Sequence, residues 1–206
     1  MRNAKHKMFS TFLPAAVALF LTAIAVQVYA EPVTFTVNPD DFSKVTFIST
    51  AKVETFEGTT NRIAGSFTVD PQDIQAGVSG KLEVDMTALT TGISQRDNHM
   101  RENHLNTDQF PRSNFVPTKV VDGSFKMLPD NESVQFTLEG EFTLHGVTHT
   151  IQPVITATWH SSQKTLDVTA KFSVRLEDYD IPLPQFLVLK LAQEQKVEIR
   201  FMAKAS

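Results

Sequence analysis

Two stretches of regular alternation decide the fold of this chain: residues 133–144, SVQFTLEGEFTL, and residues 165–176, TLDVTAKFSVRL. In both, apolar side chains fall on every second position and polar side chains fill most of the positions between them. Successive side chains of a β-strand point to opposite faces, so each stretch predicts a strand with one apolar and one polar face.

The same period of two recurs along the chain, at 197–203 and in shorter form at 33–37, 45–47, 66–69, 82–86 and 151–159. Turn-forming residues separate these stretches, as at Asp70-Pro71, 121–123, 129–131 and His145-Gly146. No long helical pattern alternates with the strands, which argues against βαβ units. The sequence predicts a single all-β domain of roughly eight to ten antiparallel strands.

One segment, residues 92–111 (GISQRDNHMRENHLNTDQFP), breaks this rhythm. It is rich in charged and amide side chains and poor in β-branched ones. We expect a helical turn or a short helix packed over one end of the sheet.

The first thirty residues have the pattern of a secretory signal. Basic residues at the start precede a twelve-residue apolar run at 15–26, and small residues end at Ala30. The run is short for a membrane span, which needs about 20 residues. We expect cleavage there, a periplasmic location, and a mature domain of residues 31–206 that is not stably inserted in a membrane.

Charge and composition exclude several classes of partner. Removal of residues 1–30, which hold three basic and no acidic residues, changes the formal charge from −4 to −7. Nucleic acids and anionic membrane surfaces require basic patches, so neither is expected as a partner. The chain has no cysteine, which excludes disulfides, thiolate metal ligands and thiol nucleophiles.

Catalytic and metal-binding motifs are absent from the sequence. It contains no G-x-S-x-G elbow, no H-E-x-x-H helix and no glycine-rich phosphate loop. The five histidines of the mature chain lack the spacing of a ligand set: His99, His104, His145, His149 and His160. We therefore expect a protein that is not an enzyme and that has no cofactor and no specific metal site.

The apolar faces must be hidden, either between two stacked sheets or inside a closed barrel. The alternation itself does not choose between these architectures. The chain has 16 phenylalanines. A barrel of about eight strands can either be filled by such side chains or hold one small ligand.

Four blocks, in order, carry a family resemblance: residues 44–65, 90–115 (TTGISQRDNHMRENHLNTDQFPRSNF), 140–148 (GEFTLHGVT) and 178–182 (DYDIP). With them, residues 33–204 resemble the YceI-like proteins, which are exported bacterial proteins. The resemblance implies an eight-stranded antiparallel lipocalin-like barrel with a short helix near one end. It also implies a periplasmic location and an apolar tunnel for a polyisoprenoid, quinone-like or fatty-acyl chain. Many members have a histidine in the first hairpin, where this chain has Ser49-Thr50-Ala51.

Candidate ligand-binding residues follow from the apolar faces and from the irregular segment. We expect the aromatic side chains of these faces to line the tunnel: Phe47, Phe67, Phe136, Phe142, Trp159, Phe172 and Phe201. Arg96, His99 and Arg101 are the candidates for binding a polar head group, since guanidinium groups suit phosphate or carboxylate oxygens. In the alternative, Arg96 pairs with a neighbouring acid or donates to loop carbonyls, and so fixes the shape of the segment.

The sequence thus favours a binding protein that carries, stores or sequesters an apolar isoprenoid or acyl lipid, either as a monomer or as a homodimer. A second hypothesis is a solid-cored barrel that binds another protein through its loops. A third is a small enzyme that acts on a bound lipid.

Overall fold

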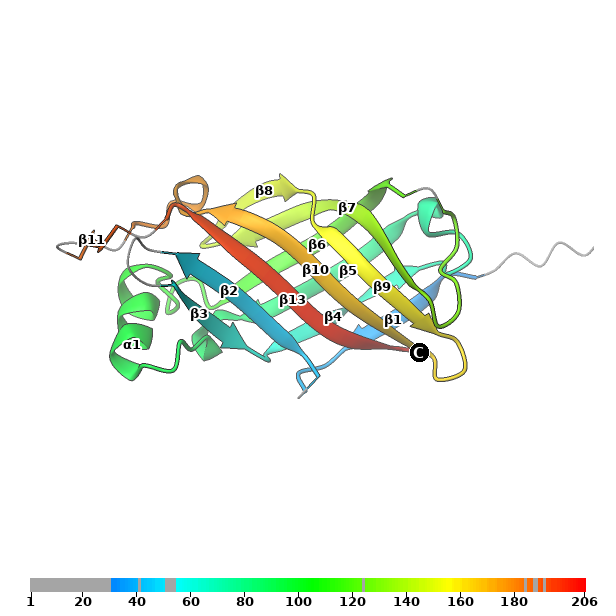
Figure 1. Ribbon diagram of the computed structural model, residues 1–206, viewed down its shortest axis with the longest axis horizontal. Helices are drawn as coiled ribbons and strands as arrows, with labels where there is room; N and C mark the ends of the chain where they lie inside the picture. Colours follow the sequence, from blue (N-terminus) through cyan, green and yellow to red (C-terminus); the bar gives the residue numbers. More distant parts are fainter. Residues whose placement is uncertain are drawn as a thin grey trace, which may run out of the picture.

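The computed structural model describes residues 31–40, 42–50, 55–123, 125–183, 185–186, 189–190 and 192–206. The proposed signal peptide, residues 1–30, lies outside them. The described part is an elongated barrel of antiparallel strands with a short α-helix at one end (Figure 1).

Eleven strands build the barrel wall: β1 (Val33–Val37), β2 (Lys44–Thr50), β3 (Thr55–Thr60), β4 (Ile63–Val69), β5 (Val78–Asp85), β6 (Arg112–Asp122), β7 (Ser133–Leu144), β8 (Val147–Ile151), β9 (Val154–His160), β10 (Thr165–Arg175) and β13 (Glu194–Ala205). The hydrogen-bonded order is β1-β4-β5-β6-β7-β9-β10-β13, and β13 pairs back with β1, which closes the ring. The predicted eight-stranded antiparallel barrel is thereby confirmed.

Three barrel strands are each made of two pieces. β1 and β2 run in the same direction along β13, and β3 and β4 follow one another alongside them. β8 and β9 likewise pair with successive halves of β7, with Gln152 and Pro153 between them. Proline has no N–H to donate to a strand ladder, which explains the break at this point.

The remaining elements are short. They are α1 (Ser94–Asn103), the 3-10 turns η1 (Ile74–Ala76), η2 (Met86–Ala88) and η3 (Leu176–Tyr179), and the small hairpin of β11 (Gln185–Phe186) and β12 (Leu189–Lys190). Helix α1 and β11 lie at the same end of the barrel (Figure 1). The expected short helix within residues 92–111 is therefore present. No helix among the described residues is long and apolar enough to cross a membrane.

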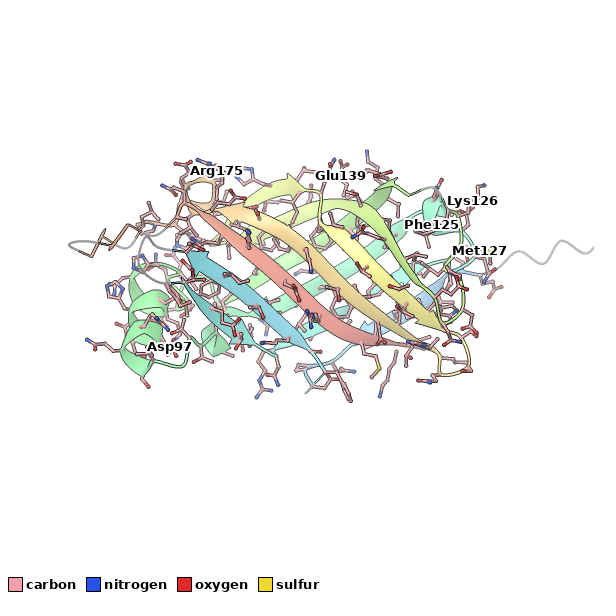
Figure 2. The ribbon with its side chains drawn as sticks, in the orientation of Figure 1. Asp97, Phe125, Lys126, Met127, Glu139 and Arg175 are labelled. Carbon is pink, nitrogen blue, oxygen red and sulfur yellow. The ribbon has the colours of Figure 1, made fainter. Side chains whose placement is uncertain are left out.

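The end of the barrel opposite α1 is closed by a packed core. Phe35, Ile74 and Leu128 are buried there to within a few per cent of full burial. The segment around Lys126 folds across this end: Ile74 N donates to Lys126 O at 2.8 Å, and Leu128 N donates to Pro71 O at 2.8 Å. Figure 2 shows Phe125, Lys126 and Met127 at this end and Asp97 of α1 at the other. The closed end thus leaves the α1 end as the side on which an interior space can open.

Candidate functional site: an apolar cavity at the α1 end

A cavity of about 330 Å³ lies inside the barrel at the α1 end. Its wall consists mainly of aliphatic and aromatic side chains from the inner faces of β2, β10 and β13, and its mouth includes residues of α1 and of the turn after η3. Ligand sites in proteins typically measure about 300–1,000 Å³ and are lined mostly by apolar groups. The cavity therefore has the size and the lining of a site for an apolar molecule.

A second cavity, of about 100 Å³, lies deeper in the barrel. Five side chains line both cavities: Val84, Ser113, Phe142, Phe172 and Ile199. The two spaces therefore adjoin, and together they follow the interior from the α1 end toward the packed core.

Five of the seven predicted tunnel residues lie on the walls of these cavities. Phe47 lines the larger one, Phe67 and Phe201 line the smaller one, and Phe142 and Phe172 line both. The rings of Phe142 and Phe172 meet edge to face, with centroids 5.3 Å apart. Their position makes contact with a ligand geometrically possible, and that contact stays a prediction.

The other two, Phe136 and Trp159, line neither cavity and belong to the packed end. Trp159 meets Phe35 edge to face at 5.4 Å, and Phe136 meets Phe125 in the same manner at 6.1 Å. Both point into the barrel, as their place in the alternation predicts, but they lie at a level where core side chains fill the interior. The alternation identifies the inner face of a strand and not the depth at which the interior is hollow.

A glycine on the neighbouring strand accommodates the ring of Phe47. Phe47 stands opposite Gly58 in the register of β2 and β3. A Cβ at Gly58 would lie 2.1 Å from Phe47 Cε1, far inside van der Waals contact. The missing side chain lets the ring lie across β3 as part of the cavity wall.

A buried carboxylate anchors α1 over the mouth of the cavity. The Asp97 side chain is 5% exposed. It accepts hydrogen bonds from Thr90 Oγ1 at 2.5 Å, Thr91 N at 2.7 Å and Thr91 Oγ1 at 2.6 Å. Burial alone would raise the pKa of Asp97, but these bonds and the nearby Arg101 outweigh it and lower the pKa. Asp97 thus has a structural role, since its bonds tie α1 to Thr90 and Thr91.

The three head-group candidates are placed differently from one another. Arg96 and His99 line the larger cavity. Arg96 also donates to Thr91, from Nε to Oγ1 at 2.8 Å and from Nη2 to the carbonyl at 3.1 Å. Arg101 is not among the lining residues and donates to Leu89 O at 2.9 Å and Asn98 Oδ1 at 3.0 Å. The bond from Arg96 to the Thr91 carbonyl is of the kind expected if Arg96 fixes the shape of the segment. Arg96 therefore combines this contact with a place on the cavity wall.

His104 is a mouth residue that the sequence did not single out. Its Nδ1 donates to Pro182 O at 2.7 Å, so in the neutral ring Nε2 accepts from His99 Nδ1 at 3.1 Å. Burial lowers the pKa of His104, as does the neighbouring His99, while the bond to Pro182 opposes both. His99 and His104 are five residues apart, and within one helix side chains meet at spacings of three or four. His104 follows the last residue of α1, so its side chain can still turn toward His99.

Other histidines fasten the chain at this end. His145 Nδ1 donates to Tyr179 O at 3.0 Å, and His149 Nε2 donates to Asp178 O at 2.7 Å. Both bonds tie the β7–β8 hairpin to η3. Within the described residues no group of three or more His, Cys, Asp or Glu side chains converges on a point that could hold a metal ion.

Comparisons with solved structures agree with this architecture. BcnA from Burkholderia cenocepacia superposes with a TM-score of 0.66 at 14% identity, covering 79% of this chain and 96% of that one. A polyisoprenoid binding domain from Saccharophagus degradans gives 0.65 at 16% identity, with 85% and 100% covered. The YceI protein of Campylobacter jejuni gives 0.53 at 14% identity, with 72% and 85% covered. At these identities the likeness establishes the fold.

The sequence itself carries the family assignment. No curated protein matches the chain. The model of the YceI-like domain, in contrast, matches residues 35–205, which is nearly the whole described barrel. The chain therefore belongs to the family of YceI-like domain proteins.

Proposed function

We propose that this protein is an exported binding protein that holds a long apolar ligand inside the barrel, for transport, storage or sequestration. The ligand is a polyisoprenoid, a quinone-like molecule or a fatty-acyl lipid. The observation that carries this proposal is the pair of adjoining apolar cavities of about 330 and 100 Å³. A structural neighbour described as a polyisoprenoid binding domain supports the same ligand class.

The volumes set the length of chain that can be buried. An apolar cavity of about 150 Å³ binds benzene, with its six carbons, so the two cavities have room for roughly 13 and 4 carbons. Burial of about 17 carbons gains roughly 14 kcal/mol at ~0.8 kcal/mol each. Association costs about 4–15 kcal/mol, so a ligand must fill most of both cavities to bind tightly.

The alternative of a solid-cored barrel fits one end of the molecule alone. Core side chains fill the interior beside Phe35 and Leu128. At the α1 end, the cavity walls stand apart. A barrel that served purely as a scaffold for its loops would gain from filling this space, since packed interiors are more stable than hollow ones. The hollow end therefore favours ligand binding over the interaction-protein hypothesis.

Extraction of the native protein tests the proposal. The mature protein is purified from the envelope of its own host without detergent, extracted with organic solvent, and analysed by mass spectrometry. We expect one long-chain apolar molecule per protein. Empty protein that also takes up no farnesol and no long-chain alkanol after purification would refute the proposed function.

A further inference from the structure

Two buried polar side chains face the larger cavity with atoms that have no partner. Ser49 is 1% exposed and Gln195 is 6% exposed, and both belong to the cavity wall. Ser49 Oγ and Gln195 Oε1 have no hydrogen-bond partner in the part of the chain that the structure describes. Burying a polar atom without a partner destabilises a protein, so two such atoms at one place call for a physical reason.

The strand register brings these two residues together. β2 and β13 pair Ile48 with Lys196 and Phe47 with Val197. The paired residues end at Ile48 and Lys196, and Ser49 and Gln195 lie one residue beyond this last pair on each strand. The two segments remain neighbours beyond it, since Ala192 N donates to Thr50 O at 2.8 Å, and neighbouring strands lie about 4.7–4.9 Å apart. Ser49 and Gln195 also line the same cavity. One small ligand group can therefore reach both polar atoms.

The chemistry of the two atoms is complementary. Gln195 Nε2 donates to Ala192 O at 2.6 Å, and because a carbonyl can only accept, this bond fixes the orientation of the amide. Gln195 Oε1 is then left as an acceptor. The Ser49 hydroxyl can donate as well as accept. The site offers one donor and one acceptor side by side.

We propose that Ser49 and Gln195 form a hydrogen-bonding site for a neutral hydroxyl at the head of the apolar ligand, which makes the ligand a long-chain alcohol or phenol. This inference rests on the proposed function. The ligand hydroxyl donates to Gln195 Oε1 and accepts from Ser49 Oγ. An ether or a quinone carbonyl can only accept, and a phosphate or carboxylate would place its negative oxygens against Gln195 Oε1. A hydroxyl satisfies both protein atoms.

The position of the pair also fits a head group. Ser49 lies near the end of β2 and Gln195 near the start of β13, and both strand ends lie at the α1 end of the barrel (Figure 1). The smaller cavity lies toward the packed end, beside Phe67 and Phe201. With its hydroxyl at Ser49 and Gln195, a ligand can extend its tail along the axis into the deeper cavity.

Matched ligands test the site in the mature protein after removal of lipid. Displacement of the fluorescent probe N-phenyl-1-naphthylamine is measured for farnesol, farnesyl methyl ether and farnesyl phosphate. The three share one tail and differ in the head group. We expect farnesol to bind about tenfold more tightly than the ether. Gln195→Met should abolish most of this preference and leave binding of the ether unchanged, because only the hydroxyl can donate to Gln195 Oε1. Ser49→Ala should weaken binding of farnesol and of the ether alike, because the oxygen of either head group can accept from Ser49 Oγ.

Ser113 supplies the matched control. Its hydroxyl also borders both cavities but already donates to Thr143 O at 2.9 Å. Ser113→Ala should keep the preference for farnesol and lower the melting temperature of the unliganded protein. Ser49→Ala removes an unpaired hydroxyl and should leave that melting temperature unchanged or raise it.

The outcomes separate the site from the function. Three outcomes would refute the Ser49–Gln195 site while carriage of an apolar ligand stands. They are equal affinity of wild type for farnesol and its ether, tighter binding of farnesyl phosphate than of farnesol, and an intact farnesol preference in Gln195→Met. Unchanged binding of both farnesol and the ether in Ser49→Ala would remove Ser49 from the site. If none of the three ligands displaces the probe, the proposed function fails and this inference fails with it.

Discussion

Substituting Ala170 isolates the contribution of the deeper cavity. Ala170 on β10 lines the smaller cavity and not the larger one. Ala170→Leu adds three carbons to a space with room for roughly four, so the leucine fills it without overpacking. A ligand tail then loses about four carbons of burial, which corresponds to about 3 kcal/mol, or roughly 150-fold in Kd. Chains of up to about 12 carbons, which fit the larger cavity alone, should bind as they do to wild type.

A series of straight-chain alkanols from 10 to 18 carbons measures this effect by probe displacement. For wild type, Kd should fall about fourfold per added carbon until about 17 carbons and then level off, since each buried CH₂ contributes ~0.8 kcal/mol. For Ala170→Leu the plateau should begin near 13 carbons. Thr169→Leu, which adds bulk on the opposite face of the same strand, is the control. Identical plateaus in Ala170→Leu and wild type, or equal weakening of short and long chains, would refute the two-cavity reasoning.

Three further predictions concern the anchor, the wall and the N-terminus. Asp97→Asn should lower the free energy of unfolding by about 1–3 kcal/mol at pH 7. The pKa of Asp97 in the folded protein is lowered from 3.8, so the stability difference between wild type and Asp97→Asn should be complete above pH 3.8 and vanish as the pH falls through the folded pKa. Urea titrations at several pH values measure this difference, and a difference that does not change with pH would contradict the role of Asp97 as an anchor of α1. Gly140→Ala would place a Cβ 2.6 Å from Val116 O and should lower the free energy of unfolding by about 1–3 kcal/mol. Gly123→Ala, whose Cβ would have its nearest neighbour 3.3 Å away, should lower it clearly less, and equal melting temperatures of the two variants would contradict this prediction. The intact mass of the exported protein should correspond to cleavage after Ala30, and a mass that includes residues 1–30 rules the cleavage out.

The strands were predictable from the sequence because alternation is a local property. β7 and β10 coincide with the two stretches of strict period two. Closure into a barrel was not predictable from that pattern, because an apolar face does not specify which strands pair at the edges. The pairing of β1 with β13 joins the first and last strands of the chain, and the family resemblance alone indicated it.

The hollow and filled parts of the interior could not be separated from sequence. Trp159 and Phe172 are both aromatic, and both face inward on neighbouring strands. The segment around Leu128 crosses the barrel end opposite α1 and fills the interior there. No local sequence pattern predicts at which end such a segment will pack. Depth along the axis depends on these distant contacts.

The polar pair in the cavity did leave a trace in the sequence. Ser49 continues the inward series of Val45 and Phe47, and Gln195 continues the series of Val197 and Ile199 backward. A polar residue in phase with an apolar face is a signal for a buried hydrogen-bonding group. His104 offered no such signal, because its contact with Pro182 joins segments far apart in the chain.

A crystal structure of the delipidated protein under xenon pressure tests the hollow interior most directly, because xenon enters dry apolar cavities. We expect xenon between the α1 end and the packed core, beside Phe142 and Phe172, with the cavity walls unmoved. An interior without xenon, with side chains closed over this space, would contradict a barrel built to hold a hydrocarbon chain.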